Sequence, residues 1–192
     1  MTNVFDQMSP AWTLRLRSEL DAADVRASAV AKHLTPPQLN WKPSSAEWSV
    51  GQCLEHLSIA NEVYLRAMAP ALEDQPRTVV QEITPGWFGR WFIRNYIAPS
   101  AKTRRGRAPR KIRPGAEVPP SVLERFLASN KAIRAFIDRA RHYDVNRIRF
   151  VNPFVGIVRF TVGTGLEITS KHESRHLLQA ERIRTALDSI LR

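Results

Sequence analysis

The stretch SKHESRHLLQAERI, residues 170–183, decides how the fold is interpreted, because it carries two histidines on one face of a long C-terminal helix. His172 and His176 lie one turn apart and therefore point the same way. They fall on a seam with alternating steps of three and four residues, the spacing of a helix face that packs in a core. A buried polar group without a partner destabilises a fold, so this end of the core must be wet, hydrogen-bonded or metal-bound. The seam consists of Val162, Gly165, Thr169, His172, His176, Gln179, Ile183, Ala186 and Ile190.

The same residues match H-E-x-x-H, the helical signature of zinc proteases, from His172 to His176. Such proteases take a third ligand from further along the chain, and no histidine follows His176. Glu173 is rotated by about 100° around the helix from His172, so it need not face a metal on the seam. The pattern therefore favours a metal site and disfavours a peptidase.

A third ligand must come from upstream, where His33, His56 and His142 are the candidates. His33 and His142 are expected at solvent-facing helix tips. His56 lies in the middle of a helix, beside its apolar stripe, although a histidine there is also typical of an exposed helix face. The residues alone leave open a metal site, satisfied core histidines and surface histidines.

Apolar periodicity predicts four helices, at about residues 10–34, 49–69, 121–141 and 162–191. We expect N-terminal caps at Ser9, at Ser121 with Glu124, and at Thr164 with Glu167. Residues 70–120 form a crossover rich in proline and arginine, with a short helix near 87–96, and residues 148–160 are expected to be an extended connector packed on the bundle. This organisation is typical of an all-α four-helix bundle, and we expect one domain over residues 1–192.

Composition excludes several classes of protein. Hydrophobic residues make up 43% and charged residues 24% of the chain, as in ordinary globular domains. No apolar run reaches the roughly 20 residues of a membrane span, and the N-terminus lacks the pattern of a secretory signal. With the single cysteine Cys53 no internal disulfide can form, so we expect a reducing, cytoplasmic location.

The net charge of +11 is concentrated in the crossover, which has no acidic residue between Glu82 and Glu117. Aromatic side chains at residues 87–96 are interleaved with the first basic ones, so the 90–113 segment could bind nucleic acid or lie on an anionic membrane surface. Nucleic-acid binding is the less favoured function, because the bundle needs these aromatic side chains as cover. The basic residues are Arg90, Arg94, Lys102, Arg104, Arg105, Arg107, Arg110, Lys111 and Arg113.

Two motifs together carry a family resemblance. W-x-P-x-x-x-x-W-S-V-x-x-x-x-x-H-L runs from Trp41 to Leu57, and H-E-x-R-H-x-x-Q runs from His172 to Gln179. The chain resembles the DinB-like family of four-helix-bundle metalloproteins over nearly its whole length. The resemblance implies that His56, His172 and His176 bind a divalent metal, zinc or nickel, and leave coordination positions open.

Relatives in that family include thiol transferases that use bacillithiol and mycothiol-dependent isomerases. The resemblance thus implies a small-molecule substrate, with a low-molecular-weight thiol as cosubstrate. The reacting group would be a metal-bound water or thiolate, and no side chain is assigned as catalytic. A metal-binding scaffold without catalysis stays open, as does the choice between a monomer and a homodimer.

Neighbouring residues have two interpretations each. Gln179 either hydrogen-bonds a ligand or a metal-bound water, or pairs across helices. Glu55 and Glu173 could be outer carboxylates around the ligands, but solvated helix surfaces are the favoured interpretation. Arg175 either meets an anionic substrate or, as favoured, is solvated.

Two further residues near the motifs are expected to have structural roles. Trp48, with Trp41, is expected to anchor the loop before the second helix, and stacking on a cofactor is the alternative. Cys53, one turn before His56, is expected to be a packed apolar residue rather than a ligand or nucleophile.

Overall fold

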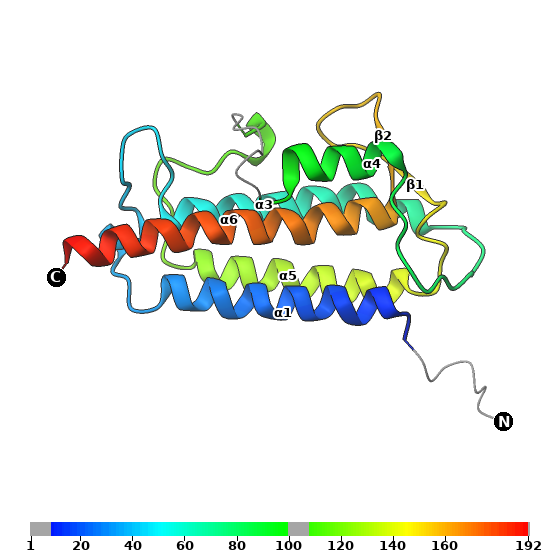
Figure 1. The fold of residues 1–192 in the computed structure, drawn as a ribbon, viewed down its shortest axis with the longest axis horizontal. Helices are drawn as coiled ribbons and strands as arrows, with labels where there is room; N and C mark the ends of the chain where they lie inside the picture. Colours follow the sequence, from blue (N-terminus) through cyan, green and yellow to red (C-terminus); the bar gives the residue numbers. More distant parts are fainter. Residues whose placement is uncertain (1–8, 100–107, 192) are drawn as a thin grey trace.

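Four long helices form the molecule in the computed structural model, which describes residues 9–99 and 108–191. They are α1 (Ala11–Ala31), α3 (Val50–Met68), α5 (Val122–Ala140) and α6 (Val162–Ile190). Figure 1 shows them lying along one axis, with α1 beside α5 and α3 beside α6. Both α1 and α3 pack against α5 and α6. The all-α fold predicted from the sequence is confirmed.

The helix ends differ in part from the expected caps. At α3, Ser49 and Gln52 form a reciprocal capping box, with Gln52 N donating to Ser49 Oγ at 3.0 Å. At α6, Thr161 is the cap and accepts from the backbone of Thr164 at 3.2 Å. The expected cap at Thr164 with Glu167 is therefore wrong.

Further differences concern α1 and α5. Pro10 stands at the N-terminus of α1 without a side-chain cap, so Ser9 is not the cap. Ser121 makes no capping hydrogen bond at α5. The first helix also ends earlier than predicted, at Ala31, because Lys32 is no longer helical and His33 has a positive φ of 59°. Thr35 and Gln38 then cap a separate short helix, α2 (Pro36–Leu39), which starts at the prolines.

Two apolar clusters fill the bundle, one toward each end. One gathers Leu16 and Leu20 of α1 with Met68, Ile133 and Leu166. The other gathers Val30, Leu54, Phe126, Leu177 and Ile183. Along α3, α5 and α6 the boundary between the clusters is occupied by buried polar residues, which are Asn61, Asn130 and Glu173.

The segment predicted as a plain extended connector folds back as a hairpin. Strands β1 (Arg149–Val151) and β2 (Arg159–Thr161) pair antiparallel, with Phe150 opposite Phe160. Both phenylalanines are buried against the bundle, and this packing supplies the support that an isolated two-stranded hairpin lacks. Gly165 of α6 allows Phe150 and Met68 to approach this helix closely, because a Cβ at position 165 would lie 2.8 Å from Phe150 Cε1 and 2.5 Å from Met68 Sδ.

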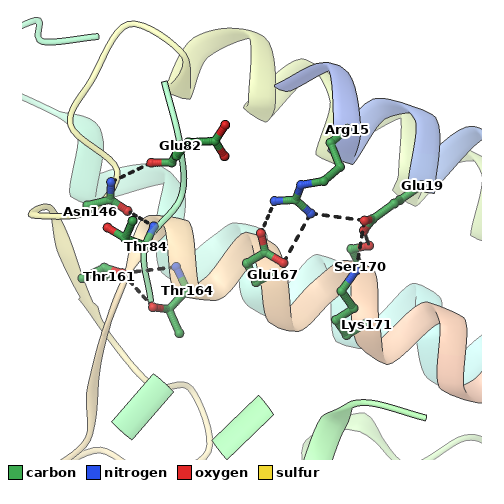
Figure 2. A network of polar contacts seen from close by, with 10 residues as sticks. All are labelled: Arg15, Glu19, Glu82, Thr84, Asn146, Thr161, Thr164, Glu167, Ser170 and Lys171. Carbon is green, nitrogen blue, oxygen red and sulfur yellow. Dashed lines mark hydrogen bonds and ion pairs between the residues drawn. The ribbon is translucent and has the colours of Figure 1, made fainter. Parts of the chain in front are cut away.

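The crossover contains the short helix expected near 87–96, as α4 (Trp87–Phe92) and a π-helical turn (Ile93–Ile97). Asn146, in the loop after α5, anchors an early part of the crossover. Its side chain accepts a hydrogen bond from Thr84 N and donates one to Glu82 O, both at 2.8 Å (Figure 2). Further along, a 3₁₀ turn (Arg110–Ile112) lies against α3. Among the described helices, none has the length and apolar character needed to cross a membrane. The basic residues Lys102, Arg104, Arg105 and Arg107 lie outside the described residues.

Candidate metal centre

Three histidines meet between α3 and α6. His56 comes from α3, and His172 and His176 come from successive turns of α6. Their potential ligand atoms all lie within 4.8 Å of one another, and the Nε2 atoms of His56 and His172 are 3.1 Å apart. His33, after α1, is exposed, and His142 lies just beyond α5. The structure thus brings together the three histidines that the motifs singled out, while their role as ligands stays a prediction.

The histidines do not lie on the innermost face of α6, which corrects the predicted seam. The buried positions around them on the helix include Thr169, Glu173, Leu177 and Ala180. Because α6 packs against both α1 and α3, its buried face is wider than one row of residues. His172 and His176 flank that face, half-buried, on the side where His56 lies.

Two of the imidazoles are oriented by hydrogen bonds to oxygen atoms. His56 Nδ1 lies 2.7 Å from the carbonyl oxygen of Ile112, so Nδ1 donates its proton and Nε2 keeps its lone pair. His176 Nδ1 lies 3.0 Å from Gln179 Oε1, which has the same consequence. Metal-binding histidines in proteins are commonly held in this way by their second nitrogen. Gln179 therefore contacts His176 on its own helix, and it makes no hydrogen bond to another helix within the described part of the chain.

Burial keeps these rings neutral. It lowers the pKa of His56 to about 4, although the Ile112 carbonyl opposes the shift. Burial, with the nearby His56 and Arg175, lowers the pKa of His176 to about 3. The pKa of His172 is also well below its usual value, for the same reason. At neutral pH all three nitrogen lone pairs are therefore available to a metal.

The chemistry of this donor set, and the spacing of one donor pair, fit a divalent metal. In a tetrahedral site with metal–nitrogen bonds of about 2.0–2.1 Å, two nitrogens lie about 3.3–3.4 Å apart. The 3.1 Å between the Nε2 atoms of His56 and His172 is close to that spacing. Three imidazoles leave at least one coordination position for a substrate or water, and they suit zinc and nickel alike.

Trp48 and Arg175 lie beside the histidines. The Trp48 ring centre is 4.8 Å from that of His56 and 5.6 Å from that of His176, so this tryptophan touches the cluster and does more than hold a loop. Arg175 donates to the Tyr96 carbonyl of the π-helical turn. Its charge also lowers the pKa of each histidine in the cluster, although less than burial does. The interpretation of Arg175 as a solvated side chain is therefore wrong.

Glu173 is also not a solvated surface residue. Its side chain is 1% exposed and accepts hydrogen bonds from Asn61 Nδ2 at 2.9 Å and Asn130 Nδ2 at 3.3 Å. Burial raises the pKa of Glu173 to about 8, and the two asparagines only partly oppose this. This polar layer was missed in the sequence, where its signal is an asparagine at position 61 in an otherwise apolar stripe.

Glu55 is buried as well, which corrects the second predicted surface carboxylate. Its oxygens accept from Gly115 N at 2.8 Å and from Arg125 Nη1 at 3.3 Å. Gln52 Nε2 donates to the carbonyl of the same Gly115 at 2.6 Å. These contacts fasten the end of the crossover to α3, close to the Ile112 carbonyl that orients His56.

Cys53 is fully buried in the apolar cluster near His56. Burial raises the pKa of its thiol above the usual range. A buried thiol of this kind is a poor nucleophile, because the thiolate is the reactive form.

A helical bundle with a three-histidine cluster between two neighbouring helices defines the class of this protein. The family model of the DinB superfamily matches residues 19–180, and the chain belongs to that superfamily. It is similar to the uncharacterized protein YuaE of Bacillus subtilis (strain 168), with 23% identity over 159 residues, which cover 82% of this chain and 90% of YuaE. No solved structure matches the chain at a significant level.

Proposed function

We propose that this protein is a divalent-metal-dependent enzyme that transfers or activates a low-molecular-weight thiol, with His56, His172 and His176 as the metal ligands. One observation carries the proposal: neutral imidazoles from α3 and α6 converge, and two of them are oriented by Ile112 O and Gln179 Oε1. Orientation by outer groups is typical of metal ligands. Satisfied core histidines would not need to gather their nitrogens in one place.

A bound zinc or nickel ion would supply Lewis acidity, which favours the thiolate over the thiol at neutral pH. The chain itself offers no accessible thiol, since its single cysteine is buried. The reacting thiol must therefore come from solution, as a cosubstrate. Such a thiol stays reduced in the cytoplasm, the location expected for this chain.

The neighbouring residues would then position the reactants. Trp48 stacks on the His176 ring and lies against the His56 ring, where it would limit the access of water. Arg175 places a positive charge near all three imidazoles, which favours a thiol or electrophile that carries a negative group.

Metal analysis of the purified protein tests the site. We expect close to one zinc or nickel per chain in the natural protein, and loss of that metal in His56→Ala and in His172→Ala. His33→Ala is the matched control, because His33 is exposed and lies outside the cluster. Full metal occupancy in both cluster variants would refute the site.

A thiol panel then separates an enzyme from a metal-binding scaffold. The metal-loaded protein is mixed with bacillithiol, mycothiol, glutathione or coenzyme A and a generic electrophile, and loss of free thiol is followed. We expect one thiol to react in a metal-dependent manner, and no reaction in His172→Ala. If no thiol turns over on fully loaded protein, the scaffold is the better interpretation.

A further inference from the structure

An exposed surface at one end of the bundle combines arginines with apolar side chains. It is formed by residues 87–94 of the α4 region and residues 147–159 of the hairpin, and we call it the hairpin–α4 surface. Figure 1 shows α4 and the two strands near one another at the end of the bundle away from the C-terminus. Phe160 of the hairpin joins them, with ring centres 5.8 Å from Phe88 and 5.3 Å from Phe92.

The outer side of this surface carries apolar groups that the core does not use. Phe150 and Phe160 face the bundle, and Arg149, Val151 and Arg159 are consequently on the solvent side of the strands. In the loop between the strands Ile157 is 94% exposed, and on α4 Trp87 is 73% exposed. Scattered single apolar residues are ordinary on a protein surface, but a group of them marks an interaction site.

Positive charge dominates the same surface. Residues 87–94 and 147–159 contain five arginines and no acidic residue. The neighbouring carboxylates are Asp144, which pairs with Arg147 at 3.5 Å, and Glu82, which is exposed before α4. None of the five arginines has a carboxylate within its own segment, and the surface therefore favours a negatively charged partner.

We propose that the hairpin–α4 surface docks on an anionic phospholipid membrane. Trp87 and Ile157 enter the headgroup region, and Arg90, Arg149 and Arg159 pair with lipid phosphates. Shallow insertion of apolar side chains, together with attraction between arginines and anionic lipid, is how peripheral proteins bind bilayers. The contact involves the surface only and is independent of the metal centre.

Two other partners fit the surface less well. Nucleic acid is bound through phosphate contacts and base stacking on aromatic rings, which would leave the two exposed aliphatic side chains of the loop, Val155 and Ile157, without a role. A second copy of the chain on a two-fold axis would bring the same arginines close to one another. The lipid surface satisfies the arginines and the aliphatic side chains together.

Vesicle flotation with the full chain tests the proposal. Vesicles of phosphatidylcholine alone are compared with vesicles that also contain phosphatidylglycerol, at low and high salt. We expect binding only to the phosphatidylglycerol vesicles, and weaker binding at high salt. Each arginine near the membrane contributes about fivefold to binding, so Arg149→Gln with Arg159→Gln is expected to lose about 25-fold.

A charge-matched pair of variants locates the contact. Ile157→Asp and Val25→Asp each place one carboxylate at an exposed aliphatic position, on the hairpin loop and on α1 respectively. We expect Ile157→Asp to weaken vesicle binding by about tenfold or more, and Val25→Asp to bind like the natural protein. Circular dichroism confirms that both variants are folded.

Three results would overturn the proposal. They are an absence of binding to phosphatidylglycerol vesicles at low salt, equal losses in Ile157→Asp and Val25→Asp, and binding to single-stranded DNA or RNA that is tighter than binding to vesicles. Unchanged metal content in Ile157→Asp is expected, so this test and the test of the metal centre can fail separately.

Discussion

His56 and His176 each use one ring nitrogen for a hydrogen bond within the protein and leave the other facing the cluster. For His56 the acceptor is a main-chain carbonyl, Ile112 O, which no side-chain substitution removes. For His176 the acceptor is the side chain of Gln179. Gln179 is therefore the residue at which the orientation of a single ligand can be tested by substitution.

Gln179→Leu removes that acceptor and keeps a side chain of similar size. Loss of such an outer contact typically weakens metal binding about 10- to 100-fold, and we expect a loss in this range for zinc or nickel. Gln179→Glu retains an oxygen acceptor for His176 Nδ1 and is the matched control, expected to bind metal at least as tightly as Gln179. Competition with a chromophoric chelator measures both affinities. Unchanged affinity in Gln179→Leu would show that the hydrogen bond does not support the ligand.

Single residues also mark where prediction from sequence reached its limit. Helical spacing placed His172 and His176 on one side of α6, and they do meet His56. Helical spacing alone could not show which side of α6 faces the centre of the bundle, because consecutive residues are rotated by only about 100° around the helix axis. Glu173, expected in solvent, is buried because Asn61 and Asn130 offer it hydrogen bonds from two other helices. Such partners come from tertiary packing, which one helix cannot reveal.

At the scale of elements, polar contacts between α1 and α6 help to fix how α6 is rotated. Figure 2 shows Arg15 between Glu19 and Glu167, and Glu19 in contact with Ser170 and Lys171. Ser170 and Lys171 directly precede His172, so these contacts attach α6 to α1 at the level of the histidine cluster. These contacts come from α1, whereas His56 comes from α3, and both helices pack against α6.

Glu19→Gln is expected to change how stability depends on pH. Burial alone would raise the pKa of Glu19, but its bonds with Ser170, Lys171 and Arg15 outweigh burial and lower it. The unfolded chain protonates this carboxylate near its ordinary pKa of 4.5, and the folded chain does so only at lower pH. The stabilisation is therefore full above about pH 4.5 and is lost as the pH falls through the lower, folded value.

Urea unfolding over a series of pH values measures this effect. The natural protein is expected to lose more stability than Glu19→Gln as the pH falls below 4.5. At neutral pH the variant is expected to be less stable by about 1 kcal/mol or less, since these partners are partly solvated. Glu62→Gln, at an exposed position of α3, is the control. Parallel pH profiles of Glu19→Gln and the natural protein would contradict the prediction.

The elements themselves were predictable to different degrees. Apolar periodicity located all four long helices, because each has a long buried stripe. The capping box of Ser49 with Gln52 was not among the predicted caps. The cap expected at Thr164 with Glu167 is wrong, because Thr161 caps α6 and Glu167 pairs with Arg15 from α1. The hairpin was missed because its strands have only three residues each and are stabilised by the bundle.

At the scale of the whole molecule, the candidate ligands join α3 to the last long helix, which are far apart in sequence. The unfolded chain cannot hold His56 close to His172 and His176, so a metal that needs all three binds the folded state preferentially. Binding of that kind raises the free energy of unfolding by mass action. The same linkage predicts that metal removal lowers the thermal stability of the entire fold.

Thermal unfolding with and without metal checks this linkage. At a free metal concentration of about 100 times the dissociation constant the stabilisation is about 2.7 kcal/mol. For a chain of this size that corresponds to a rise in Tm of about 5–10 °C. We expect the rise with zinc or nickel, its reversal by a chelator, and its absence in His56→Ala. His33→Ala, which alters a histidine outside the cluster, should keep the full rise. An equal rise in His56→Ala would mean that the metal stabilises the fold from somewhere other than the three-histidine cluster.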